Sequence, residues 1–248
     1  MILGITQGLQ EQNRIAVKRK IDTVSIAFFT LLFVPFVLYA LFSFGVLSGR
    51  SPFSNDIQAP VAKVLAGTGV GTAFLVNPTT LLTARHVVEG KSVGETVDLI
   101  FEQTKNRLQV KATIRYIAPS SASAGDMTYL LTDVAVLQVS EITEIKPLFL
   151  GESSAVRNLD EVILVGYPNG DYSITKGNIN SDTYQGYNLF KLDAASNPGN
   201  SGGPCILKDD YSVIGILIGS SAIAQQGENI ALKIDDVKRL LAQEKIQF

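Results

Sequence analysis

The sequence has one cysteine, one histidine and no tryptophan among its 248 residues. The single cysteine, Cys205, excludes an intrachain disulfide, so the burial of apolar side chains must hold the fold together. One histidine and one cysteine cannot supply the usual nitrogen and sulfur ligands of a zinc site. We therefore expect no metal and no other cofactor.

The sequence also lacks a surplus of positive charge. Its formal net charge is -2, and no basic block occurs in its second half. Both features argue against a protein that binds nucleic acid, because such proteins carry a basic surface. The length suits one large domain or two small ones, each with a substantial core.

Residues 24–47 carry no charge and are dominated by Ile, Leu, Val and Phe. About 20 apolar residues cross a bilayer as a helix, and a membrane helix tolerates an internal proline such as Pro35. The segment therefore predicts a single transmembrane helix, with a buried core helix as the alternative.

The charges that flank this segment predict its orientation. A basic cluster at 18–20 precedes it, and Arg50 is the lone basic residue close behind it. The positive-inside rule then places residues 1–23 in the cytoplasm. Residues 48–60 would form a linker and residues 61–248 a domain in the periplasm or outside the cell. A secreted protein released by signal cleavage is the alternative, although the apolar run exceeds the usual hydrophobic core of a signal peptide, about 7–15 residues.

Beyond the linker the pattern changes to short runs of β-branched and apolar residues separated by turn residues, which predicts an all-β sandwich or barrel architecture. Two sets of six strands are expected, joined by residues 141–152. The first set comprises 61–65, 72–76, 80–83, 92–101, 109–118 and 134–139, and the second comprises 162–165, 172–175, 188–192, 205–207, 213–218 and 229–233. Apolar residues at helical spacing from Ile234 onward predict a closing helix with Asp235 as its N-cap.

The segment Asp193–Pro204 sets Ser201 among glycines, prolines and small polar residues. Such residues favour a turn, and a plain surface turn is one interpretation. The other is a nucleophile loop, which needs a general base near the hydroxyl and donors for an oxyanion. His86, the only histidine, ends an apolar run, and Asp133 precedes another. Each alone would be interpreted as having an ordinary structural role.

Three phrases occur in order: Thr-Ala-Arg-His at 83–86, Asp-Val-Ala-Val-Leu at 133–137 and Gly-Asn-Ser-Gly-Gly-Pro at 199–204. They resemble the catalytic blocks of chymotrypsin-like (trypsin-like) serine proteases, and their order is that of the chymotrypsin triad. Four further phrases, at 71–76, 166–168, 175–177 and 192–195, are similar to the bacterial HtrA/Deg branch. The resemblance covers about residues 60–235.

The resemblance implies a fold of two six-stranded antiparallel β-barrels, with His86 and Asp133 on the first and Ser201 on the second. It implies that Ser201 is the nucleophile, that His86 transfers its proton and that Asp133 orients the imidazole. The backbone N–H groups of Gly199 and Ser201 would form the oxyanion hole.

Two departures from the family pattern bear on regulation. Asn200 stands where zymogen-activated trypsins carry an aspartate that pairs with a newly cut N-terminus, so we expect no such activation. HtrA-type proteases usually carry a PDZ module after the protease, whereas this sequence stops at Phe248, so we expect none here. A Ser/Ala/Gly stretch at 120–126 is either a flexible loop that contributes to a latent site or an ordinary hairpin connection.

The resemblance also locates the substrate-binding residues. Ala195 would lie at the base of the S1 pocket and Ser220 on the segment that pairs with substrate, which predicts small or medium apolar P1 side chains. Glu228 offers the alternative of a basic P1, although a solvated loop glutamate is the simpler interpretation. Cys205, near the site, is expected to be a buried, inert thiol.

The sequence thus predicts a membrane-anchored serine endopeptidase that acts on polypeptides outside the cytoplasm, with no prediction of its oligomeric state. A catalytically silent member of the same fold that only binds peptides is the main alternative.

Overall fold

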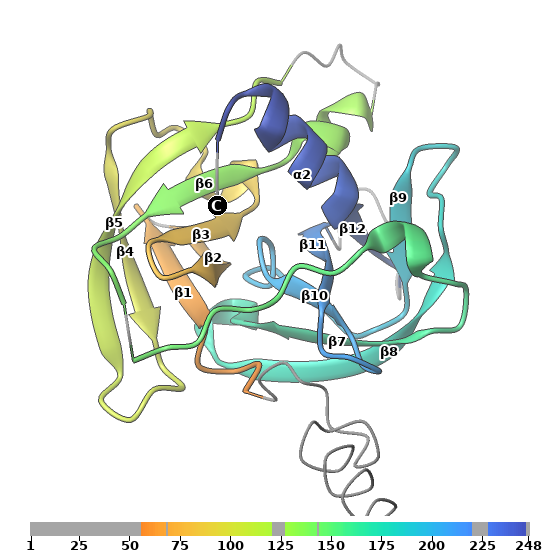
Figure 1. The fold of residues 1–248 in the computed structure, drawn as a ribbon, viewed down its shortest axis with the longest axis horizontal. Helices are drawn as coiled ribbons and strands as arrows, with labels where there is room; N and C mark the ends of the chain where they lie inside the picture. Colours follow the sequence, from red (N-terminus) through yellow and green to blue (C-terminus); the bar gives the residue numbers. More distant parts are fainter. Residues whose placement is uncertain (1–55, 68, 121–126, 143, 220–227, 247–248) are drawn as a thin grey trace, which may run out of the picture. The chain divides into compact units, whose positions relative to one another are not determined.

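Twelve antiparallel strands form two closed six-stranded barrels in the computed structural model (Figure 1). The structure describes residues 56–67, 69–120, 127–142, 144–219 and 228–246. The expected membrane segment, the linker up to residue 55, Ser220 and most of the 120–126 stretch lie outside these residues. No helix in the described ranges is long and apolar enough to span a membrane.

Barrel 1 has the strand order β1-β2-β3-β6-β5-β4, and β4 pairs with β1 to close it. Its strands are β1 (Val61–Ala66), β2 (Gly69–Asn77), β3 (Thr80–Thr83), β4 (Thr96–Phe101), β5 (Leu108–Ile117) and β6 (Ala135–Gln138).

Barrel 2 repeats this arrangement with the order β10-β11-β12-β9-β8-β7, closed between β7 and β10. Its strands are β7 (Glu161–Gly166), β8 (Ser173–Ser181), β9 (Leu189–Leu192), β10 (Pro204–Leu207), β11 (Val213–Gly219) and β12 (Asn229–Lys233). The predicted pair of six-stranded barrels is confirmed.

Several strands are apolar on both faces, because one face lines the interior of the barrel and the other packs into a core shared by the two barrels. In β3, Leu81 points into barrel 1 and Leu82 into a separate core shared with barrel 2. In β11, Leu217 fills barrel 2, and Ile216 joins the shared core. Because neighbouring side chains on a strand point to opposite faces, such strands show no polar alternation.

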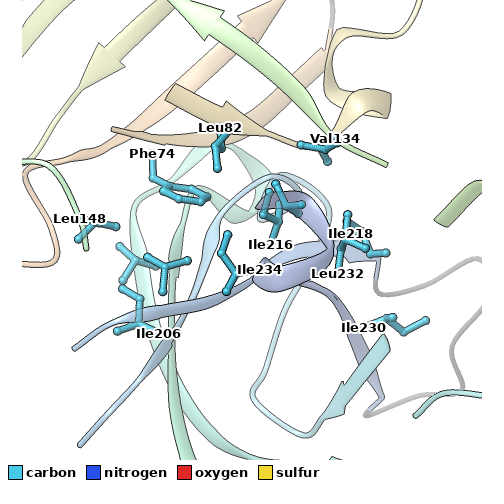
Figure 2. Packing of buried hydrophobic residues seen from close by; sticks show 14 of the residues in the cluster. Phe74, Leu82, Val134, Leu148, Ile206, Ile216, Ile218, Ile230, Leu232 and Ile234 are labelled. Atoms are coloured by element: carbon cyan, nitrogen blue, oxygen red, sulfur yellow. The ribbon is translucent and has the colours of Figure 1, made fainter. Parts of the chain in front are cut away.

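The shared core joins the two barrels. Figure 2 shows Phe74, Leu82 and Val134 of barrel 1 facing Ile216 and other apolar side chains of barrel 2. Burying a side chain of this size contributes roughly 1.5–3 kcal/mol. The shared core therefore fixes one barrel against the other.

The closing helix is α2 (Ile234–Gln243), which lies beside β11 and β12 (Figure 1). It buries Ile234, Val237 and Leu241 in the shared core. The helix itself was predicted, but the assignment of its cap was wrong. Lys233 is the N-cap residue, and Asp235 lies in the first turn. Its carboxylate instead accepts a hydrogen bond from the backbone of Ser154, at 2.9 Å, on the connection between the barrels.

Candidate active site

His86 and Asp133 come together because β3 and β6 are paired neighbours. Thr83, at the end of β3, lies opposite Ala135, at the start of β6. His86 follows β3 in a short 3₁₀ helix (Arg85–Val88), and Asp133 stands just before β6, after a second one (Met127–Thr132). Both side chains therefore emerge at the same end of barrel 1.

Two hydrogen bonds join these residues. The Nδ1 atom of His86 lies 2.6 Å from Oδ2 of Asp133, and the His86 backbone N–H donates to Oδ1 at 3.0 Å. A carboxylate only accepts, so Nδ1 carries the hydrogen in this pair, and Nε2 of a neutral imidazole is left as the acceptor. The Asp133 side chain is 2% exposed, so water does not compete for these bonds.

Arg85 adds a cation beside this pair, which the sequence did not suggest. Its Nε atom lies 3.9 Å from Oδ1 of Asp133. Tyr129 lies near both charges. Burial, followed by the Asp133 carboxylate, raises the pKa of its phenol, and Arg85 opposes this shift. The tyrosine therefore stays neutral near the aspartate.

The loop that carries Ser201 belongs to barrel 2 but is held against barrel 1. The backbone N–H of Thr72, on β2, donates to the Ser201 carbonyl at 2.9 Å. Gly202 has φ +83°, and a Cβ atom there would lie 2.3 Å from Thr83 Oγ1 and 2.8 Å from the Ala84 nitrogen. Only a glycine allows this loop to approach the backbone just before His86 so closely.

The Ser201 hydroxyl forms no hydrogen bond with His86 within the described part of the chain. Such contacts are often long without substrate and shorten when it binds. The structure therefore brings His86 and Asp133 into direct contact and holds the Ser201 loop against the strand that leads to His86.

The N–H groups of Gly199 and Ser201 are available as donors. The Pro198 carbonyl accepts from the backbone N–H of Asn169 at 2.7 Å, and the Asn200 carbonyl accepts from that of Gly203 at 2.9 Å. No cis peptide bond occurs in the described ranges, and in a trans peptide the N–H and the C=O point in opposite directions. The N–H of Gly199 therefore points away from the Pro198 carbonyl, and the N–H of Ser201 points away from the Asn200 carbonyl. Neither N–H has a backbone acceptor among the residues that the structure describes.

Thr72 is a further residue of the site that sequence reasoning did not single out. Its buried hydroxyl donates to the Gly199 carbonyl at 2.7 Å and accepts from the Tyr167 N–H at 3.1 Å. Thr72 belongs to the phrase at 71–76 that carries part of the family resemblance. This was the only indication in the sequence that Thr72 belongs to the site.

Asn200 is buried, in contrast to an exposed turn residue. Its Nδ2 donates to Ser196 Oγ at 3.3 Å, and its Oδ1 lies where a Cβ on Gly166 would approach to 2.5 Å. The side chain is therefore accommodated without a charged partner.

Of the two residues expected to bind substrate, the structure describes Ala195. Ala195 is exposed, and its carbonyl accepts from Thr175 Oγ1 at 2.7 Å. Glu228 forms an ion pair with Lys191. The neighbouring Asn229 is buried and donates from Nδ2 to the Ala194 carbonyl at 2.6 Å, a contact that the sequence did not suggest. Ser220 is outside the described residues.

Cys205, on β10, is fully buried, and burial raises the pKa of its thiol to about 12. A thiolate is the reactive form of cysteine, so this side chain is chemically inert at neutral pH.

Comparison with known proteins assigns this geometry to one family. The family profile described as "Trypsin-like peptidase domain" matches residues 71–216. The chain is 31% identical over 209 residues to the serine protease Do-like HtrA of Bacillus subtilis, an alignment that covers 77% of this chain and 42% of that protein. It is also 31% identical over 179 residues to Do-like HtrB of the same species, covering 66% of this chain and 35% of that protein.

Solved structures agree on the fold. The HtrA-type protease AlgW, determined with a tripeptide, superposes with a TM-score of 0.60 at 23% identity, covering 77% of this chain and 61% of that one. The chain spans less than half the length of the HtrA and HtrB proteins it matches.

Proposed function

The chain belongs to the trypsin-like peptidase family, and from that premise we propose that it is a serine endopeptidase that cleaves polypeptides through Ser201, His86 and Asp133. The observation that carries the proposal is the 2.6 Å bond between His86 Nδ1 and Asp133. That bond leaves Nε2 free to accept a proton, next to a loop with two N–H groups available for an oxyanion.

The chemistry proceeds in two stages. Ser201 Oγ attacks the scissile carbonyl carbon while His86 Nε2 takes the hydroxyl proton, and the Gly199 and Ser201 N–H groups bind the resulting oxyanion. The C–N bond then breaks, and Nε2 gives its proton to the leaving amine. Water then attacks the acyl carbon while His86 Nε2 takes its proton, and the ester C–O bond breaks as Nε2 returns that proton to Ser201 Oγ. One oxyanion donor is typically worth about 3 kcal/mol of the barrier.

A fluorophosphonate probe tests this proposal on the full chain. We expect the wild type to react covalently and Ser201→Ala not to react, with peptide hydrolysis reduced about 10⁴-fold or more in the variant. The alternative is a silent peptide-binding member of the fold. It would bind peptides without labelling at Ser201, and that result would replace the peptidase proposal.

We extend the proposal to a preference for small or medium apolar side chains at P1. Ala195 brings no charge, the buried Asn229 amide is neutral, and Glu228 is already paired with Lys191. A peptide-library cleavage profile tests this preference. Dominance of Lys or Arg at P1 would instead assign Glu228 to the pocket.

The proposal includes an uncleaved membrane anchor at residues 24–47, with residues 1–23 in the cytoplasm and the protease domain in the periplasm or outside the cell. It is supported by the uncharged apolar run and the basic cluster at 18–20. Cell fractionation tests it: the full-length chain should remain in washed membranes. Recovery of only a soluble form lacking about the first 50 residues would indicate a secreted protease.

A further inference from the structure

Lys63 extends from β1 of barrel 1 to a loop of barrel 2. Its Nζ atom donates to the Gly170 carbonyl at 3.0 Å and pairs with Glu102 Oε1 at 2.5 Å. It also lies 5.5 Å from the centre of the Tyr167 ring. The Lys63 side chain is only 13% exposed, unlike an ordinary surface lysine. This ammonium group therefore forms part of a contact between the two barrels.

The loop that Lys63 contacts also touches the Ser201 loop. Gly170 ends a short 3₁₀ segment (Pro168–Gly170), whose middle residue, Asn169, donates its N–H to the Pro198 carbonyl at 2.7 Å. The two loops are packed backbone against backbone, because a Cβ on Gly199 would lie 2.3 Å from the Tyr167 carbonyl oxygen. A shift of either loop therefore moves the other.

The backbone of this segment is irregular and is anchored to β1. Asn169 has φ 54° and Gly170 has φ 89°, so two consecutive residues adopt the left-handed region. Asparagine tolerates this region better than most residues with a side chain, so the contacts of the segment, rather than strain, fix its position. Lys63 holds the Gly170 carbonyl, and the Tyr167 hydroxyl donates to the Val61 carbonyl at 3.2 Å. Both anchors lie on β1.

We propose that Lys63 is a positioning residue for the oxyanion hole. By fixing the Gly170 carbonyl, it keeps the adjacent Asn169 N–H aimed at the Pro198 carbonyl. That bond turns the Gly199 N–H toward the substrate side. Without it the peptide between Pro198 and Gly199 is free to rotate, which replaces a donor in the hole with a carbonyl oxygen. The inference rests on the proposed peptidase function.

Lys63→Met tests the inference in the full chain. Methionine keeps an unbranched apolar stem, and Glu102 retains its second partner, Arg107, at 3.1 Å. Complete loss of one oxyanion donor lowers kcat about 10²–10³-fold, so we expect a fall in kcat of roughly 10–100-fold for partial loss, with KM changed less than about twofold. Affinity for a peptide boronate, whose tetrahedral adduct occupies the hole, should fall by a similar factor.

Lys111→Met is the matched control. Lys111 also lies on a strand of barrel 1 and pairs with an acidic residue, Asp98, at 2.7 Å. Its side chain is 71% exposed and has no hydrogen bond to the described residues of barrel 2. We expect wild-type kcat and boronate affinity for this variant. If Lys63→Met does not fold, Lys63→Leu gives the same comparison, because leucine also lacks a donor for the Gly170 carbonyl.

The outcomes separate the two proposals. Unchanged kcat and boronate affinity in a folded Lys63 variant would overturn the positioning role, and so would a change confined to KM or to the free energy of unfolding. A wild-type chain that neither hydrolyses peptides nor reacts with a fluorophosphonate would overturn the peptidase proposal, and the positioning role with it.

Discussion

Thr72 shows how one side chain holds a loop of one barrel against a strand of the other. Its backbone N–H bonds the Ser201 carbonyl, and its hydroxyl bonds the Gly199 carbonyl and the Tyr167 N–H. The Thr72 carbonyl in turn accepts from Thr83 Oγ1 at 2.7 Å. These bonds reach both residues that offer oxyanion donors. The position of the loop therefore depends on a hydroxyl that takes no part in the chemistry.

Thr72→Val tests this role with almost no change in side-chain volume. The variant leaves the Gly199 carbonyl and the Tyr167 N–H buried without this partner, so we expect the free energy of unfolding to fall by about 1–3 kcal/mol. We also expect a lower kcat, because the loop loses one restraint. Urea denaturation and steady-state kinetics measure the two effects.

Thr72→Ser is the control, since serine restores the hydroxyl. It should recover most of the lost stability and activity. Equal losses in the serine and valine variants would show that the methyl group, not the hydroxyl, is what matters.

At the scale of residues, the sequence was informative where the chemistry requires a particular residue type. Three phrases in order, which resemble the catalytic blocks of trypsin-like serine proteases, led to the proposal of His86, Asp133 and Ser201. Thr72 and Lys63 could not be found in this way. Their roles arise from contacts between segments about 100 residues apart, and a threonine or lysine on a strand has many ordinary explanations.

At the scale of elements, Gly202 in the Ser201 loop and Gly186 in the turn between β8 and β9 have the same φ but different surroundings. Gly202 requires both a positive φ and space, since a Cβ would lie 2.2 Å from the Thr72 carbonyl oxygen. Gly186 has the same φ of +83° but nothing within 4 Å of a Cβ. Comparing substitutions at Gly202 and Gly186 therefore distinguishes the effect of backbone strain from that of a steric collision.

We expect Gly202→Ala to reduce activity strongly and to destabilise the fold by more than Gly186→Ala. The second variant carries only the cost of a left-handed alanine, about 1–2 kcal/mol, and should keep wild-type kinetics. In the first, the Ser201 loop must move away from barrel 1 to relieve the overlap. Denaturation experiments and kcat/KM measurements on both variants test this difference. Similar losses of stability with intact activity in both variants would contradict a steric collision at position 202.

The first turn of α2 contributes a pH-dependent contact. Burial raises the pKa of Asp235, but hydrogen bonds from Ser154 and Ser153 outweigh this effect and leave the pKa below its usual value. A carboxyl whose pKa is lowered on folding stabilises the protein above its unfolded pKa, near 3.9, and this contribution is lost as the pH falls through the folded value.

Asp235→Asn should therefore be less stable than the wild type near pH 7, and the difference should shrink as the pH falls below about 4. Asparagine keeps an acceptor oxygen but has no charge to titrate. Urea denaturation at a series of pH values measures the effect. A stability difference that stays constant or grows in acid would contradict a stabilising role of the charged Asp235 carboxylate.

Element boundaries were predicted best where apolar runs end at turn residues. The strand at 229–233 was predicted with its observed ends, whereas β8 continues to Ser181, well beyond the predicted end at 175. That extension contains Lys176, Gly177 and two asparagines, which have low strand propensity. Pairing with β7 as far as Asn178, and with β9 at Ile179 and Ser181, overrides this preference, because backbone hydrogen bonds do not depend on side-chain type.

At the scale of the whole molecule, three cores rather than two hold the described chain together. Each barrel has its own interior, and a third cluster combines side chains of both barrels and α2. The sequence predicted two strand sets and their joint, but not the third core. Both faces of a strand such as β11 are apolar, and a continuous apolar run does not say which face meets another barrel.

The shared core predicts that the two barrels unfold as one unit. Ile216 is fully buried in that core, opposite Leu82 and Val134 of barrel 1 (Figure 2). Ile216→Ala should lower the free energy of unfolding by about 2–5 kcal/mol, and the milder Ile216→Val by about 0.5–1.5 kcal/mol.

Native-state hydrogen exchange by mass spectrometry reports each barrel separately. If the barrels are coupled, amides of β3 and β6 lose protection in step with those of β11 and β12, although the substitution lies in barrel 2. Retention of wild-type protection in barrel 1 alone would mean that the barrels fold independently, and the site between them would then depend on the local contacts of Thr72 and Lys63.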